Sequence, residues 1–112
     1  AINFIAYSLA EQGRDLDRAL ALAEQALALR DRPHIRDTLG WVHYKRGDYA
    51  EALKHLQMAL AEMGDDPVVQ EHIGDTLAAL GRFPEAMAAY RRSLAQEPDN
   101  PAVRDKLRKL EE

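Results

Sequence analysis

The sequence predicts an all-α protein built from stacked helix pairs, and three observations support this fold class. Gly13, Gly47 and Gly81 stand 34 residues apart, and an Ala-rich amphipathic stretch follows each of them. Within each half of this unit, apolar residues recur at i, i+3, i+4 and i+7, which is the period of a helix with one buried face, and strand-like alternation is absent. The chain of 112 residues also has no cysteine and only 6% aromatic residues, a composition that favours helix over sheet.

The breaks in this pattern predict the bounds of the helices. Asp48 with Glu51 three residues later is typical of a capping box, and Asp66 is expected to cap a helix that starts at Pro67. Proline suits a first helical position because it lacks the N–H that a helix start leaves unpaired. We expect helices over residues 1–12, 16–30, 34–46, 49–62, 67–80, 84–96 and 101–111.

These residues resemble the tetratricopeptide repeat, a helix pair with Leu-Gly and Tyr in its first helix and Ala, Phe and then Pro in its second. Leu39-Gly40 and Ile73-Gly74 carry the first-helix motif, in which a side chain on the glycine would hold the two helices apart. The resemblance covers essentially the whole chain. It implies one domain, a right-handed α-solenoid of three helix pairs at about 1–32, 33–66 and 67–100 with a capping helix at about 101–112.

The two ends of the array differ. Residues 101–112 begin a fourth unit with one apolar face and then stop, which resembles the capping helix of the family, with Asn100 as its N-cap. The first helix is apolar almost all round, and we expect a preceding repeat or a partner to cover it. We hypothesise that Ile2 or Phe4 mediates self-association there, because an uncovered repeat edge behaves as an exposed apolar patch.

The resemblance implies that the first helix of each repeat lines a concave wall, which is the expected peptide site. Our candidate partner-binding residues are the positions on this wall that packing does not use: Asn3, Tyr7, His34, Asp37, Thr38, Trp41, Tyr44, Lys45, Glu71, His72 and Asp75. The wider inner face adds Ala10, Glu11, Val68, Ala78 and Ala79, and the last helix could add Asp105, Lys106 and Lys109.

Aromatic residues form the expected centre of this wall. Tyr7, Trp41 and Tyr44 are of the amphipathic aromatic type that often anchors partner chains. Trp41 follows Gly40 and does not occupy the usual Trp position of the family, so we expect it to face the groove. The alternative is that Trp41 and Tyr44 only pack between neighbouring helices.

Chaperone-binding members of the family hold a peptide carboxylate with Lys and Asn from the first repeat, Asn from the second, and Lys and Arg from the third. The corresponding positions in this chain hold Asn3, Tyr7, Thr38, Val68 and His72. Recognition of the Glu-Glu-Val-Asp tails of heat-shock proteins is therefore disfavoured.

Other classes of function receive little support. The formal charge of −4 provides no basic field for nucleic acid, and no run of 18 apolar residues could insert into a membrane. Glu71 and Asp75 lie one turn apart but lack a closed pocket for acid/base catalysis. The four histidines form no i, i+4 pair with one another and no cysteine supports them, so we expect no metal site and no cofactor. His34 and His72 could act as a pH switch if they face the groove.

We therefore predict a non-catalytic scaffold that binds a protein or peptide in its concave groove. The alternative is a structural self-association module, a homo-oligomer that uses the edge at Ile2 and Phe4. The chain also looks like the late repeats of long bacterial tetratricopeptide proteins, some of which are exported or lipid-anchored. That likeness suggests a bacterial source and a location in the cytoplasm or in the periplasm and envelope.

Overall fold

The computed structural model describes residues 2–112, and this part of the chain forms seven α-helices and no strand. Every predicted helix is present, and each end lies within one residue of its predicted position, although Ala1 of the first predicted helix lies outside the described residues. The helices are α1 (Ile2–Gln12), α2 (Leu16–Leu29), α3 (Pro33–Arg46), α4 (Tyr49–Met63), α5 (Pro67–Ala79), α6 (Phe83–Gln96) and α7 (Pro101–Glu111).

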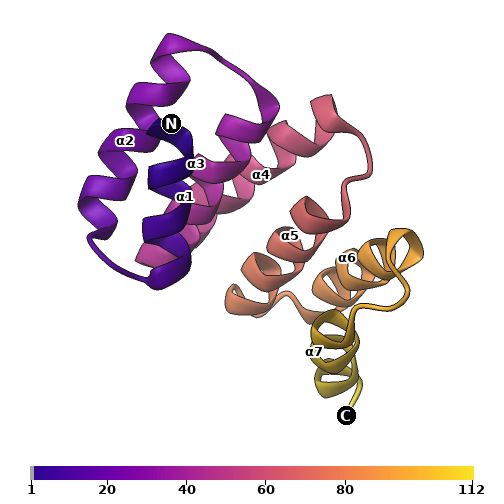
Figure 1. Cartoon of the computed structure of the whole chain (residues 1–112). Coiled ribbons are helices and arrows are strands. Elements are labelled where there is room, and N and C mark those ends of the chain that lie inside the picture. The colour runs from indigo at the N-terminus through magenta and orange to yellow at the C-terminus, as the bar shows by residue number, and fades with distance from the viewer. Residues whose placement is uncertain (1) are drawn as a thin grey trace.

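The helices stack in chain order as three antiparallel pairs and a cap (Figure 1). The pairs are α1 with α2, α3 with α4, and α5 with α6, and α7 packs on α6. This stack is elongated, with extents of 41 × 25 × 23 Å. Among residues 2–112, no helix is both long enough and apolar enough to cross a lipid bilayer.

Two glycines allow the helices of a pair to cross closely. A Cβ atom on Gly40 would lie 2.8 Å from Cγ of Leu56 on α4, and one on Gly74 would lie 2.5 Å from Cε1 of Tyr90 on α6. Both distances are far below van der Waals contact. The interpretation of these glycines from the sequence is therefore confirmed.

The repeated glycines after the first helices have a different role. Gly13, Gly47 and Gly81 have φ angles of 66°, 89° and 77°, in the left-handed region that only glycine enters without strain. Asp66 accepts hydrogen bonds from the backbone N–H groups of Val68 and Val69, as its predicted cap requires. Local chemistry therefore ends the first helix of each unit at a glycine and starts α5 at Asp66.

The predicted capping box at Asp48 is wrong. The Asp48 side chain makes no N-cap hydrogen bond and instead lies 3.3 Å from Nδ1 of His43 and 3.2 Å from Nη1 of Arg46. Glu51 contacts Lys54 and His55 on its own helix. Nearby cationic and imidazole groups on α3 and α4 thus compete successfully for both carboxylates.

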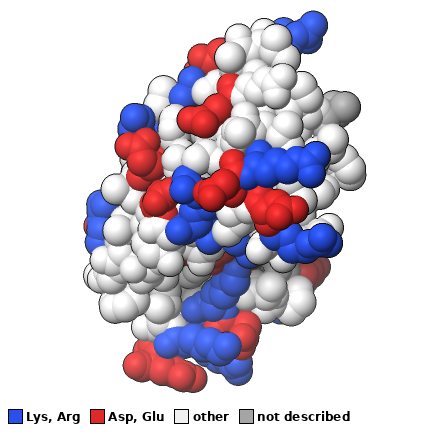
Figure 2. Space-filling model, turned by 90° about the vertical axis from the view of Figure 1, so that its left-hand side faces the viewer, with Lys and Arg blue, Asp and Glu red and all other residues white. Residues whose placement is uncertain are grey.

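Two apolar clusters form the core. The first joins α1, α2 and α3 and includes Ala6, Ala23, Leu39, Trp41 and Val42, whereas the second joins α4 through α7. Val103 of α7 is fully buried in the second cluster, so α7 covers the outer side of the last pair as a capping helix does. On the side shown in Figure 2, Lys and Arg lie among Asp and Glu without a broad patch of one sign.

Candidate functional site

The first helices of the repeats and the capping helix surround a cavity of about 410 Å³, which we call the inner pocket. Seven of the eleven candidate residues line it: Tyr7, Trp41, Tyr44, Lys45, Glu71, His72 and Asp75. Three further residues of the wider inner face complete its lining, namely Glu11 on α1, Val68 on α5 and Lys106 on α7. The structure thus brings most of the candidates together on one concave surface.

Trp41 is the centre of this wall and is held on three sides. Its ring stacks on Tyr44 with centroids 4.6 Å apart and on His72 with centroids 3.8 Å apart. Its Nε1–H donates to Oε1 of Glu11 across a distance of 2.6 Å. Only 6% of Trp41 is exposed, so it packs between α1, α3 and α5 as well as lining the pocket. Trp41 therefore combines the two alternatives that the sequence left open, because it lines the pocket and also packs between neighbouring helices.

His72 lines the pocket and links the third repeat to the second through a contact with Asp37. It is 5% exposed, and its Nδ1 lies 3.3 Å from Oδ1 of Asp37 on α3. The ring of Tyr7 lies 6.5 Å from the His72 ring, measured between centroids. Asp37 supports the pocket through this pair but does not line it.

Lys106 closes the pocket by bridging two carboxylates of α5. Its Nζ donates to Glu71 at 2.8 Å and to Asp75 at 3.1 Å, and Asp75 also accepts from the Tyr90 hydroxyl at 2.6 Å. Burial acts to lower the pKa of Lys106, but hydrogen bonds and charge from Glu71 and Asp75 outweigh it and raise the pKa. These carboxylates are tied to a permanent cation, so they are not arranged as an acid/base pair.

The aromatic hydroxyls of the pocket stay protonated well into the alkaline range. Burial, followed by the charges of Glu11, Asp37 and Glu71, raises the pKa of Tyr7 to about 12. Burial and the charge of Asp75 also raise the pKa of Tyr44. At neutral pH both groups are therefore neutral hydrogen-bonding groups beside carboxylates.

Three candidates lie away from the inner pocket, and their assignment to its wall is corrected. Thr38 is 3% exposed, and its hydroxyl donates to the carbonyl of His34 on the preceding turn of the same helix. Asn3 and His34 line a separate hollow with Ile2, near the N-terminal edge. His34 stands seven residues before Trp41, which is about 10 Å along α3. The pH switch at His34 required this residue to face the groove, and His34 does not line the inner pocket.

Two other residues of the predicted wider inner face also lie outside the lining of the inner pocket. Ala10 is fully buried in the apolar cluster of α1, α2 and α3, and Asp105 pairs with Arg108 and Lys109 on the surface of α7. Lys106 was not among the eleven candidates, although it stands 34 residues after His72 and so occupies the same register position. The sequence analysis named Lys106 only as a possible addition from the last helix, and this register position is the signal that singles it out from Asp105 and Lys109.

The N-terminal edge exposes apolar side chains. Phe4 is 73% exposed, Ile5 42% and Leu29 69%, and Ile2 lines the hollow between α1 and α3. These residues belong to the first helix pair and do not contribute to the inner pocket. A partner on this edge and a peptide in the pocket would thus use different surfaces.

Comparison with known proteins identifies the type of repeat. A family model described as tetratricopeptide repeat matches residues 9–73 and 43–110. A TPR repeat-containing protein of Pseudomonas aeruginosa is 34% identical over 76 residues, which are 67% of this chain but only 13% of that protein. The bacterial relative agrees with the bacterial source that the sequence suggests.

Solved structures share the fold. The first TPR domain of human RPAP3 has a TM-score of 0.89 and 21% identity, over 98% of this chain and 87% of that one. The second TPR domain of human RPAP3, in complex with the HSP70 peptide SGPTIEEVD, has a TM-score of 0.85 and 20% identity, over 99% and 92%. A thermophilic TPR protein of Thermus thermophilus has a TM-score of 0.78 and 25% identity, over 94% and 58%.

Proposed function

The chain belongs to the tetratricopeptide repeat family, and on this premise we propose that it is a non-catalytic scaffold whose inner pocket binds a peptide segment of a partner protein. The observation that carries the proposal is the convergence of four helices on one pocket with an aromatic wall. The human RPAP3 domain of the same fold binds a peptide. Because the stacked helices hold this wall in place before binding, a partner does not have to order it.

The charges of the pocket favour a peptide that presents a basic side chain. Glu11, Glu71 and Asp75 contribute three carboxylates to the lining, and Lys45 and Lys106 contribute two ammonium groups. These five charged groups give the lining a net negative charge, and Glu11 is exposed. An Arg side chain can pair with carboxylates and stack on aromatic rings at the same time. A peptide carboxylate would meet repulsion in the same place.

Peptide binding to the inner pocket can be followed by the intrinsic fluorescence of Trp41. Trp41 is the one tryptophan in the sequence, and it forms the pocket wall. Peptides selected from a random displayed library on the immobilised chain would be titrated while the fluorescence of Trp41 is recorded. We expect selected peptides to contain Arg or Lys, and each Arg→Glu peptide to bind at least tenfold more weakly, which corresponds to about 1.4 kcal/mol.

A matched pair of variants tests the location of the site. Val68 is 44% exposed and lines the pocket, whereas Leu80, at the other end of the same segment, is 38% exposed and lies outside the lining. Val68→Lys is expected to weaken a basic peptide at least tenfold, and Leu80→Lys to leave its affinity unchanged. Failure to select any peptide, or equal losses in both variants, would contradict peptide binding in the inner pocket.

Self-association through the N-terminal edge is the second candidate function. The exposure of Phe4 and Leu29 favours it, because neighbouring exposed apolar side chains gain by burial against a partner surface. Sedimentation of the chain should then report a dimer that Phe4→Glu dissociates. Phe83→Glu is the control, since Phe83 is 48% exposed on the opposite part of the array. A monomer at high micromolar concentration would eliminate this candidate.

A further inference from the structure

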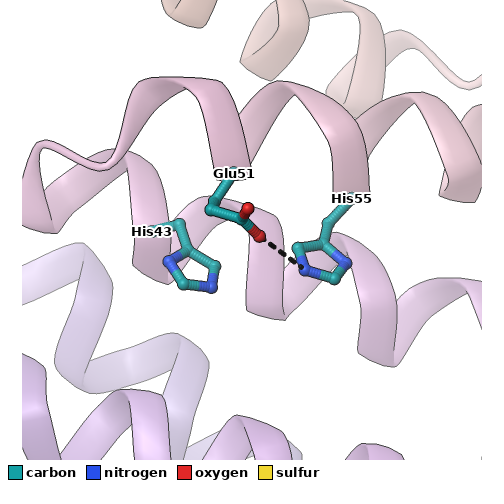
Figure 3. A group of neighbouring side chains, drawn as sticks. All are labelled: His43, Glu51 and His55. Atoms are coloured by element: carbon teal, nitrogen blue, oxygen red, sulfur yellow. Dashed lines mark ion pairs between the residues drawn. The ribbon is translucent and has the colours of Figure 1, made fainter.

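Two histidines and a glutamate meet on a face of the middle repeat that is separate from the inner pocket. His43 lies on α3, and Glu51 and His55 lie one turn apart on α4, with the Glu51 carboxylate between the two rings (Figure 3). One ligand atom from each residue lies within 4.8 Å of the other two. The three side chains line a hollow of about 560 Å³ that shares no residue with the inner pocket.

The orientation of His43 suits a metal ligand. Its Nδ1 lies 3.3 Å from Oδ2 of Asp48, so the proton of the neutral ring is held on Nδ1. This leaves Nε2 with a free lone pair. A carboxylate on the far nitrogen is the usual second-shell arrangement for a metal-binding histidine, since it sets both the tautomer and the ring direction. The Asp48 side chain that fails to cap α4 thus has a defined role.

Glu51 and His55 already lie close to ligand spacing. Nε2 of His55 is 3.7 Å from Oε2 of Glu51. Two ligands at tetrahedral positions around Zn²⁺ are about 3.3 Å apart, given bonds of about 2.0–2.1 Å. The rings of His43 and His55 are nearly parallel, with centroids 5.6 Å apart, so the rings must turn about their side-chain bonds before both Nε2 lone pairs point at one ion. His43 and His55 are largely buried, with 13% and 12% of their side chains exposed.

We propose that His43, Glu51 and His55 bind a divalent transition-metal ion, with Zn²⁺ as the best fit. Imidazole nitrogens suit Zn²⁺, Ni²⁺ and Cu²⁺, whereas Mg²⁺ and Ca²⁺ prefer oxygen ligands alone. Two histidines and one glutamate form a known Zn²⁺ ligand set, which leaves a fourth position open to water in the hollow. The bound ion would cross-link α3 to α4 and stabilise the middle repeat.

Arg36 is expected to weaken metal binding, because its guanidinium contacts His55, and replacing it tests the proposed ligand geometry. Its Nη1 lies 3.2 Å from Nδ1 of His55, and its Nη2 binds both carboxylate oxygens of Asp31 at 3.0 Å. Because guanidinium only donates, it favours an unprotonated Nδ1 on His55. Metal binding at Nε2 instead requires the proton on Nδ1, so Arg36 must move away. Arg36→Gln removes this conflict, because the glutamine carbonyl can accept from Nδ1–H.

The experiment is a calorimetric titration of the whole chain with Zn²⁺, alongside Mg²⁺, with histidine ring nitrogens followed by long-range ¹H–¹⁵N NMR. We expect one equivalent of Zn²⁺ to bind and to shift Nε2 of His43 and His55. His43→Asn, His55→Asn and Glu51→Gln should each weaken binding at least about 100-fold, beyond the typical second-shell loss. Asp48→Asn should weaken it about tenfold, and Arg36→Gln should tighten it.

Matched controls keep the result specific. His34→Asn replaces an exposed histidine at the start of α3, and Glu62→Gln replaces an exposed glutamate near the end of α4. Neither should change Zn²⁺ affinity, and circular dichroism checks that every variant keeps its helices. The proposal is overturned if the wild-type chain shows no saturable binding up to millimolar Zn²⁺, or if folded His43→Asn and His55→Asn variants bind as well as the wild type. Weaker binding by Arg36→Gln would overturn the assigned geometry.

Discussion

Replacing Gly74 by alanine is expected to force apart the helices of the third repeat. The new Cβ would lie 2.5 Å from Cε1, 2.7 Å from Cδ1 and 3.0 Å from Cζ of Tyr90. The Tyr90 ring cannot easily retreat, because it is 3% exposed in the core and its hydroxyl donates to Asp75 at 2.6 Å. The substitution must therefore either move α6 or displace the ring and break this hydrogen bond.

The magnitude follows from three contributions. Overpacking of a well-packed core costs about 1–3 kcal/mol, and a lost hydrogen bond to a charged group costs about 1.5–3 kcal/mol. Alanine returns about 1 kcal/mol through its higher helix propensity. A contact of 2.5 Å with a ring that cannot easily retreat puts either route at the upper end of its range, about 3 kcal/mol, so the net loss is about 2 kcal/mol. Gly40→Ala should cost less, about 1 kcal/mol, because the Leu56 side chain that it meets is flexible.

The assay is urea unfolding followed by circular dichroism and by Trp41 fluorescence. Gly74→Ala should reduce the free energy of unfolding by about 2 kcal/mol, or lower the Tm by about 8 °C. Ala21→Gly, at an exposed position within α2, calibrates the helix-propensity contribution. Tyr90→Leu combined with Gly74→Ala should cost at least about 0.5 kcal/mol less than the two single changes added together. A Gly74→Ala variant as stable as the wild type would refute the close-crossing argument.

Two further predictions concern the inner pocket. Trp41→Ala should lower the free energy of unfolding by about 3 kcal/mol or more, since Trp41 is only 6% exposed. Urea unfolding followed by circular dichroism would measure this loss. An unchanged urea midpoint would contradict the packing role of Trp41. The pKa of Tyr7 is raised from 10.0 to about 12, so the stability that this group adds below pH 10 should disappear as the pH rises toward 12. Tyr7→Phe should reduce that alkaline loss, and equal alkaline profiles would contradict the burial of the hydroxyl.

The helices were predictable because their signals are local. Asp66 caps α5 with its own side chain, and Gly47 ends α3 in a conformation that other residues avoid. The sequence also predicted the close crossings at Gly40 and Gly74, because both glycines occupy the small first-helix position of the tetratricopeptide motif. Charged side chains were harder to place, as Asp48 shows, because a long or flexible partner on another helix can compete with a local cap.

The sequence by itself determined the helices, the repeat and the face that lines the concave wall, because these depend on residues three, four or 34 positions apart. Only the tertiary structure decided that Trp41 is clamped between Tyr44 and His72, and that Lys106 reaches Glu71. It alone placed His43 beside Glu51 and His55, a grouping that no spacing within one helix reveals. The physical reason is that distances between side chains on different helices depend on packing angles and rotamers, which no local pattern encodes.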